Sequence, residues 1–159
     1  MCQTTSPTLV KLSNKGRYGV QAVFDIAFHN DGRPTQIKVI SARQGIPPRF
    51  LEQIFQELKR SGLVTSKRGP KGGYALALPP EEISVGAVVR ALEGPTVLTS
   101  PDEGRTGDAA SRAVTEAAFA DLGDRLDACF DDLTIGELCE RGQRDGLRRR
   151  APRRHVYSI

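Results

Sequence analysis

The chain has 159 residues, of which 38% are hydrophobic and 26% charged, a size that fits one domain and an accessory element. It has no apolar run long enough to cross a bilayer and no signal-peptide pattern, so we expect a cytoplasmic protein without a membrane partner. The net charge of +4 hides an asymmetry. Residues 11–78 carry 12 Lys and Arg against 4 Asp and Glu, whereas residues 79–143 carry 5 against 14. The basic part is the one suited to a polyanion.

Residues that would support catalysis or metal binding are scarce. The cysteines are Cys2, Cys129 and Cys139, and the histidines are His29 and His155. This set contains no C-x-x-C pair and is too scattered for a disulfide scaffold or a structural zinc site. The chain also lacks the serine-hydrolase elbow, the zinc-protease helix motif and the phosphate-loop spacing. We therefore expect no enzymatic activity, no catalytic residue, and no metal or other cofactor.

The first two predicted helices lie in the basic part of the chain. The first begins near Ser13 and carries apolar residues at helical spacing. Lys15 and Arg17 lie in its first turn, where positive charge opposes the helix dipole, so phosphate contact explains them better than helix stability does. The second helix is short, with Thr35 as its predicted N-cap and Gly45 at its end.

A third helix is predicted over about residues 48–61, after a turn that contains two prolines. Its apolar face is formed by four residues, Leu51, Ile54, Phe55 and Leu58. The opposite face carries Arg49, Glu52 and Gln53, whose side chains can recognise guanine, cytosine and adenine edges in the DNA major groove. The alternative is an ordinary solvated helix face.

Two short strands, residues 63–65 and 74–78, are predicted around a glycine-rich turn. The turn carries Lys67, Arg68 and Lys71 together with three glycines, which allow close approach of the backbone to a ligand. A solvated turn is the alternative for this hairpin taken alone. Two helices joined by a glycine-containing turn and followed by a basic hairpin are typical of a winged helix-turn-helix, whose second helix enters the major groove.

The acidic second half is predicted to be mostly helical, with a short helix over about 83–92, a long one over 109–133, and a short one that follows Thr134. The long helix has more apolar residues than a small domain needs. We predict that it forms a homodimer with a second copy, and packing on its own domain is the alternative. The predicted dimerisation residues are Val114, Ala118, Phe119, Leu122, Leu126, Cys129, Phe130 and Leu133.

The sequence thus predicts a mainly α fold with a small β-hairpin wing: a winged helix-turn-helix with a long dimerisation helix. We expect a flexible leader (1–10), a winged helix-turn-helix DNA-binding domain (11–94), a loop (95–108), the dimerisation helix with a short following helix (109–143), and a disordered basic tail (144–159). The tail contains six arginines. It either strengthens nonspecific DNA binding or is only a solvated tail.

Several motifs resemble the Rrf-two family of bacterial transcription regulators. They are residues 13–19 (SNKGRYG), 43–46 (RQGI), 50–55 (FLEQIF), 68–74 (RGPKGGY) and 132–138 (DLTIGEL), and the resemblance covers about residues 10–140. It implies a homodimer that binds a palindromic operator in double-stranded DNA, usually as a repressor, with the residue matching Arg68 in the minor groove. By motif match, the resemblance implies DNA contacts at Lys15, Arg17, Arg49, Phe50, Glu52, Gln53, Arg68, Lys71 and Gly72. Lys67 and Tyr74 of the hairpin complete the predicted DNA-binding residues.

The chain departs from the family in the loop before the long helix. Many members carry three cysteines there, which bind an iron–sulfur cluster that sets the affinity for DNA. Residues 93–119 of this chain contain no cysteine and no histidine, and Ala113 and Glu116 stand where a family cysteine and histidine would lie. Because such clusters need thiolate or imidazole ligands, we expect a cluster-free regulator.

The signal that controls such a regulator stays open among an effector small molecule, a partner protein and thiol oxidation. We expect Cys129 and Cys139 to be buried structural thiols. Two alternatives remain: a thiol-based or metal-based sensor that uses one of these cysteines, and a protein-interaction module that retains the winged-helix fold without reading DNA.

Overall fold

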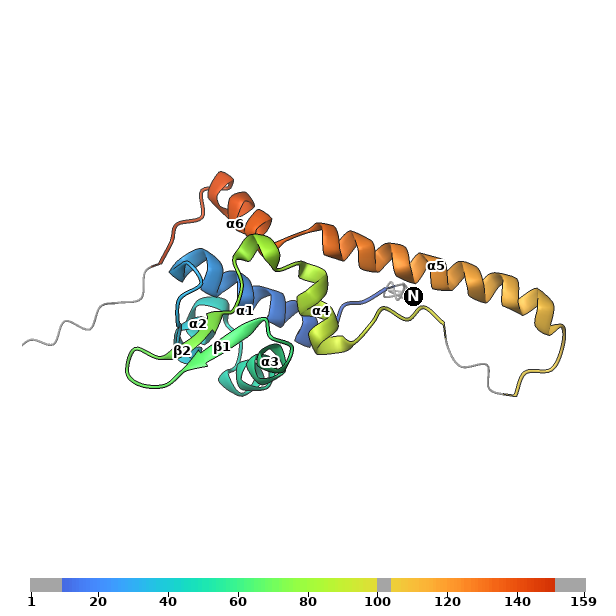
Figure 1. The fold of residues 1–159 in the computed structure, drawn as a ribbon, viewed down its shortest axis with the longest axis horizontal. Coiled ribbons are helices and arrows are strands. Elements are labelled where there is room, and N and C mark those ends of the chain that lie inside the picture. The colour runs from blue at the N-terminus through green and yellow to red at the C-terminus, as the bar shows by residue number, and fades with distance from the viewer. Residues whose placement is uncertain (1–9, 100–103, 151–159) are drawn as a thin grey trace, which may run out of the picture.

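The computed structural model describes residues 10–99 and 104–150 (Figure 1). Within these ranges the elements are α1 (Asn14–Asn30), α2 (Ile37–Gln44), α3 (Pro48–Arg60), β1 (Val64–Lys67), β2 (Gly73–Leu76), the 3-10 helix η1 (Pro80–Glu82), α4 (Val85–Glu93), α5 (Ala109–Asp132) and α6 (Ile135–Arg144). The mainly α fold with a β-hairpin is confirmed. None of the helices in the described ranges has the length and apolar character needed to cross a bilayer.

Helix α1 is the centre of the domain, and α2, α3, α4, α6 and strand β2 all lie against it (Figure 1). Each surrounding helix contributes apolar side chains without exposed surface. The core includes Ile26, Ile40, Phe55, Val88 and Ile135. Burial of these side chains is the main stabilising contribution to the fold. The loops and the hairpin are therefore attached to one continuous hydrophobic core.

The helix-turn-helix follows from its caps and its apolar spacing. Helix α2 ends at Gly45, whose φ of 67° lies in the left-handed region, and α3 begins with Pro48 at its first position. The four predicted core residues of α3 are all buried, because they recur on one side of the helix. The turn therefore presents the polar side of α3 to solvent.

The predicted N-cap of α2 is wrong. Gln36 occupies that position without a side-chain cap, and Thr35 instead pairs with Tyr74 of β2. Each of these two residues donates its backbone N–H to the other's carbonyl oxygen, at 2.9 Å. Gly73 permits this approach, because a Cβ there would lie 2.3 Å from the Thr35 oxygen. The chain before α2 therefore forms a single antiparallel bridge pair beside β2.

Helices α4 and α5 meet at the far side of the domain from the hairpin. The carboxylate of Glu93, the last residue of α4, accepts hydrogen bonds from the Ser13 hydroxyl and, at 2.9 Å, from the backbone N–H of Gly16. Glu93 thus caps the start of α1. Helix α5 extends away from the domain (Figure 1), and near its end Asp131 pairs with Arg90 of α4 at 2.5 Å.

The beginning of the tail differs from the expected disorder. Helix α6 continues to Arg144, and the chain then turns back, with the Leu147 N–H donating to the Gly142 oxygen at 2.9 Å. Residues 147–150, termed here the C-terminal segment, lie against the end of α1 and are held there by side chains of α1 and α2. The expectations for residues 1–9 and 151–159 lie outside the described residues.

Candidate nucleic-acid interface

The candidate interface consists of α3 and the hairpin, which lie along one edge of the molecule in Figure 1, whereas α5 and α6 lie along the other. Strands β1 and β2 are antiparallel, and the last pair of the ladder is Lys67 with Gly73. The hairpin tip, residues 67–72, projects beyond the strands (Figure 1). The interface therefore combines a helix with a cationic loop.

The tip displays its cations because glycines close the turn. The Gly72 N–H donates to the Gly69 oxygen at 2.9 Å, and Gly72 is buried against the backbone: a Cβ there would lie 2.1 Å from the Lys67 oxygen. Lys67, Arg68 and Lys71 are all exposed. Gly72 itself has only backbone to offer a ligand, so its part in the tip is conformational.

The solvent side of α3 carries the predicted base-reading residues. Arg49, Glu52 and Gln53 are exposed in the first two turns of the helix. Phe50 is 44% exposed, and its ring meets the Tyr18 ring edge to face with centroids 6.0 Å apart. The aromatic contact holds Phe50 against α1 and leaves part of its ring free at the interface.

At the start of α1, the two predicted phosphate-binding cations, Lys15 and Arg17, have different surroundings. Arg17 is exposed. The Lys15 ammonium pairs with the Glu57 carboxylate of α3 at 2.6 Å, and both side chains are partly exposed. Sequence reasoning missed Glu57, because the two residues are 42 positions apart and no pattern connects them. A phosphate that binds Lys15 must compete with Glu57.

The hairpin is positioned by two contacts that the sequence did not reveal. The Tyr74 ring stacks on the buried Phe55 ring, with centroids 4.5 Å apart and planes 10° from parallel. The Gln36 side-chain amide donates to the Pro70 oxygen in the tip, at 3.1 Å. Tyr74 therefore has a packing role between the hairpin and α3, and a DNA contact by its hydroxyl stays a prediction.

The orientation of α2 depends on a buried ion pair. The Arg43 guanidinium donates to both carboxylate oxygens of Asp25 in α1, at 2.6 and 3.1 Å, and the Gln44 amide donates to the same carboxylate at 2.8 Å. Asp25 has no exposed surface, and a buried carboxylate is tolerated only when it is paired and hydrogen-bonded. The Arg43–Gln44 motif thus fixes α2 on α1.

Helix α5 contributes nothing to this interface, and its predicted dimerisation residues divide into two groups. Leu126, Phe130 and Leu133 are half-buried against the chain's own domain. Val114, Phe119 and Leu122 are 72%, 46% and 47% exposed, and Ala118 and Cys129 are exposed as well. The apolar side of α5 therefore packs on its own domain near the C-terminal end of the helix and lies open to solvent in the part that extends away from the domain.

Comparison with known proteins assigns the family. Residues 12–141 match the sequence profile of Rrf2, described as an iron-dependent transcriptional regulator. The chain belongs to the Rrf2 family. It is 42% identical over 130 residues to the HTH-type transcriptional regulator IscR of Aliivibrio salmonicida, covering 81% of this chain and 77% of the relative. IscR of an Escherichia coli O1:K1 strain is 39% identical over 130 residues, covering 81% and 80%.

Two solved Rrf2 structures have the same fold. The structure of CymR, the global cysteine regulator of B. subtilis, superposes with a TM-score of 0.68 at 31% identity, covering 84% of this chain and 98% of that one. T. potens IscR gives the same TM-score at 33% identity, covering 89% and 94%. This chain is therefore a DNA-binding transcription regulator with a winged-helix fold. The match to the family profile ends before the C-terminal segment.

The residues of this Rrf2 member do not fit the iron–sulfur cluster that the resemblance to the family implied. Between positions 93 and 119 the sequence has neither thiol nor imidazole. Among the described residues, no group of three or more His, Cys, Asp or Glu is placed to hold a metal ion. The usual cluster ligands are thus missing from the place where they are expected.

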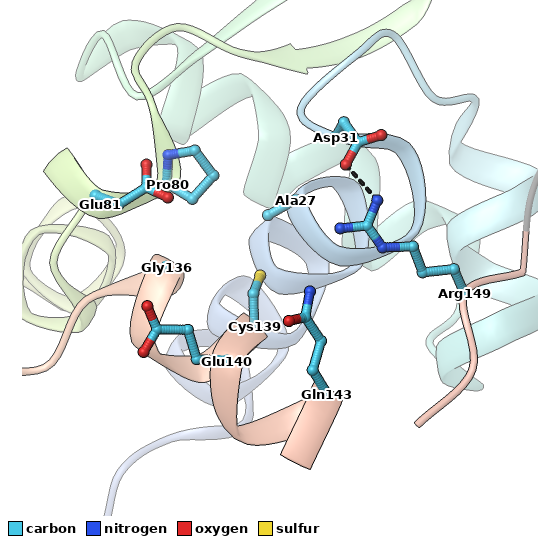
Figure 2. A pocket seen from close by; sticks show the side chains of 9 residues that line it. All are labelled: Ala27, Asp31, Pro80, Glu81, Gly136, Cys139, Glu140, Gln143 and Arg149. Atoms are coloured by element: carbon cyan, nitrogen blue, oxygen red, sulfur yellow. Dashed lines mark hydrogen bonds and ion pairs between the residues drawn. The ribbon is translucent and has the colours of Figure 1, made fainter. Parts of the chain in front are cut away.

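The two described cysteines have different environments. Cys129 was expected to be buried and is exposed, because α5 presents that side to solvent. Cys139 of α6 is half-buried, and its sulfur points into a pocket of about 250 Å³ lined also by Asp31, Glu81 and Arg149 (Figure 2). Burial raises the pKa of the Cys139 thiol to about 11, so the thiol is protonated and unreactive at neutral pH.

Proposed function

We propose that this Rrf2 regulator binds a palindromic operator as a homodimer and acts as a repressor. The observation that carries the proposal is the exposed polar side of α3 beside the cationic hairpin tip. In each copy α3 enters the major groove, where Arg49 and Gln53 have the donor and acceptor groups to read guanine and adenine. Arg68 at the tip reaches the adjacent minor groove, whose negative potential attracts a guanidinium.

The homodimer is supported by the open apolar side of α5. Val114, Phe119 and Leu122 would be covered by a second copy, which removes apolar surface from water. A single winged helix contacts few base pairs, and two copies related by a two-fold axis read a palindrome with useful specificity. A dimer that occupies an operator excludes other proteins from the same DNA, and this is how repression arises.

The controlling signal in this proposal is an effector small molecule or a partner protein. The missing cluster ligands remove the usual iron–sulfur switch, and the raised pKa of Cys139 speaks against a thiol sensor at that residue. Cys129 is exposed and remains the candidate thiol for the alternative of thiol oxidation. The regulator acts by binding, without catalysis, and in the cytoplasm, where its DNA is found.

The decisive experiment is selection from fragmented genomic DNA of the source organism by the purified full chain, followed by sequencing of the retained fragments. Enrichment of a motif with two inverted half-sites supports the proposal. The variant Arg68→Ala should lose this enrichment and keep its oligomeric state, whereas Arg141→Ala, on the opposite edge of the molecule, should behave as the wild type. Salt-sensitive binding without any enriched motif would favour the protein-interaction module.

A further inference from the structure

The C-terminal segment is fastened to the domain by several independent contacts. Arg149 Nη1 donates to Asp31 Oδ1 at 2.6 Å, and the Arg149 guanidinium lies 5.9 Å from the centre of the Phe28 ring (Figure 2 shows the ion pair). The Arg150 N–H donates to His29 Nδ1 at 2.9 Å, and Arg43 Nη1 donates to the Arg150 oxygen at 2.8 Å. An ion pair, a cation–π contact and two backbone hydrogen bonds thus converge on two residues.

His29 has a defined chemical state in this arrangement. Its side chain is buried, with 9% of the residue exposed, and its Nδ1 accepts a hydrogen bond, so the ring is neutral with its proton on Nε2. Burial is the main cause that lowers the pKa of His29, and Arg43, Arg150 and Arg149 lower it further. Asp25 acts in the opposite direction and raises it.

Protonation of His29 is incompatible with the contact that it makes. A proton on Nδ1 would face the Arg150 N–H, and two donors cannot share a hydrogen bond. The new positive charge would also lie among Arg43, Arg149 and Arg150. The charged groups that act on the ring are Asp25 of α1, Arg43 of α2, and Arg149 and Arg150 of the segment. Asp31 pairs with Arg149, and the neutral Cys139 thiol of α6 lines the same pocket as these two residues.

We propose that residues 147–150 form a pH-dependent latch that closes on α1 and α2 only while His29 is neutral. The latch is closed above the ordinary histidine pKa of about 6.5 and opens as the pH falls below it, because the closed state binds the neutral ring. Opening takes Arg150 away from Arg43, the side chain that also holds Asp25 and thereby α2. The latch therefore connects α6 to the helix-turn-helix.

The test is nitrogen-15 NMR of the full chain from about pH 8 to about pH 5, a range that spans the ordinary histidine pKa. The Arg150 amide signal and the backbone order of residues 147–150 report closure, and the imidazole nitrogen shifts report the charge of His29. We expect an ordered segment at the high end and loss of order with the same midpoint as the titration of His29. A segment that is mobile throughout, or a midpoint apart from that titration, would overturn the latch.

Two variants separate the chain's histidines. In His29→Asn the amide oxygen takes the place of Nδ1 as acceptor and does not titrate, so the segment should stay ordered at low pH. The matched control His155→Asn removes the other histidine of the sequence and should open like the wild type. The same loss of order in His29→Asn as in the wild type would show that another group drives opening and would contradict the proposal.

Discussion

The rings of Phe55 and Tyr74 stack with centroids 4.5 Å apart, and this contact joins the core of α3 to β2 close to the hairpin tip. Phe55 is fully buried, whereas Tyr74 is half-buried at the edge of the strand. The contact sets the distance between the helix proposed for the major groove and the tip proposed for the minor groove. The packing of the hairpin on α3 and the proposed recognition of DNA therefore depend on the same aromatic pair.

Tyr74→Ala should destabilise the domain by about 3 kcal/mol, in the range for loss of a large aromatic side chain from a packed site. It should also weaken operator binding, because the hairpin loses its support on α3. Chemical denaturation and a DNA titration measure the two effects. Tyr74→Phe keeps the ring and is the control. If Tyr74→Phe is fully stable but binds DNA poorly, the hydroxyl itself contacts DNA.

Arg49→Ala should change base preference, and Lys15→Ala should weaken binding to all sequences alike. The first residue projects from α3, whereas the second lies at the start of α1, where a phosphate is its expected partner. Loss of one phosphate contact should reduce the slope of log affinity against log salt by about 1. Titrations on operator and scrambled DNA at several salt concentrations provide the measurement. An unchanged slope for Lys15→Ala would remove Lys15 from the interface.

Glu57→Gln should strengthen nonspecific DNA binding, since it releases Lys15 from its ion pair at 2.6 Å and makes the ammonium available to phosphate. The double variant Lys15→Ala/Glu57→Gln is the control and should bind no better than Lys15→Ala alone. Equal gains with and without Lys15 would mean that Glu57 acts only through its general negative charge near DNA.

Arg43→Ala should cost about 3–5 kcal/mol of stability, because it leaves the buried Asp25 carboxylate without its cation. The comparison is Arg141→Ala, which breaks an exposed pair with Glu137 and should change stability by less than about 1 kcal/mol. Urea denaturation at neutral pH measures both values. A small effect of Arg43→Ala would show that water or Gln44 compensates the carboxylate.

Leu122→Glu should yield a monomer, because it places a charge in the middle of the open apolar side of α5. Sedimentation gives the oligomeric state, and circular dichroism checks that the helix persists. The monomer should bind a palindromic operator more weakly than the wild type, since each half-site is then bound separately. A Leu122→Glu chain that still dimerises would place the interface elsewhere.

Cys129 should react with iodoacetamide at neutral pH much faster than Cys139, whose thiol has a pKa of about 11. Mass spectrometry of peptides after timed alkylation follows each cysteine separately. The difference should disappear in denaturant, where burial no longer protects Cys139. Equal rates in the folded chain would contradict the half-buried position of Cys139.

The helices of the interface and those of the second half of the chain could be predicted, because the sequence patterns that indicate them are local. The apolar spacing in α3 and α5 and the caps at Gly45 and Thr134 are readable within one turn or two, and they determine where these helices begin, end and face. The glycines and cations of the hairpin tip are likewise adjacent in the chain. The exposed side of α3 followed from the same spacing.

The positioning contacts could not be predicted, because they join residues that are far apart. Thr35 has the side chain of an N-cap, yet its backbone is taken by β2, and this pairing competes with the cap. The partners of Lys15 and Asp25 became visible only once α1 was surrounded by α2 and α3. Composition alone also made residues 144–150 look disordered, since specific contacts to single side chains of α1 do not show in it.

The Glu93 carboxylate links the end of α4 to the start of α1, because it accepts hydrogen bonds from Ser13 and Gly16. Glu93 is the last residue before the segment that leads to α5, and its hydrogen bonds fix the turn that carries Lys15. We therefore expect that a partner or effector that displaces residues 94–98 also displaces the first turn of α1, because the two are joined through Glu93. Such a coupling needs no iron–sulfur cluster, because one side chain already connects the segment before α5, the helix proposed to dimerise, with the proposed phosphate contact of Lys15.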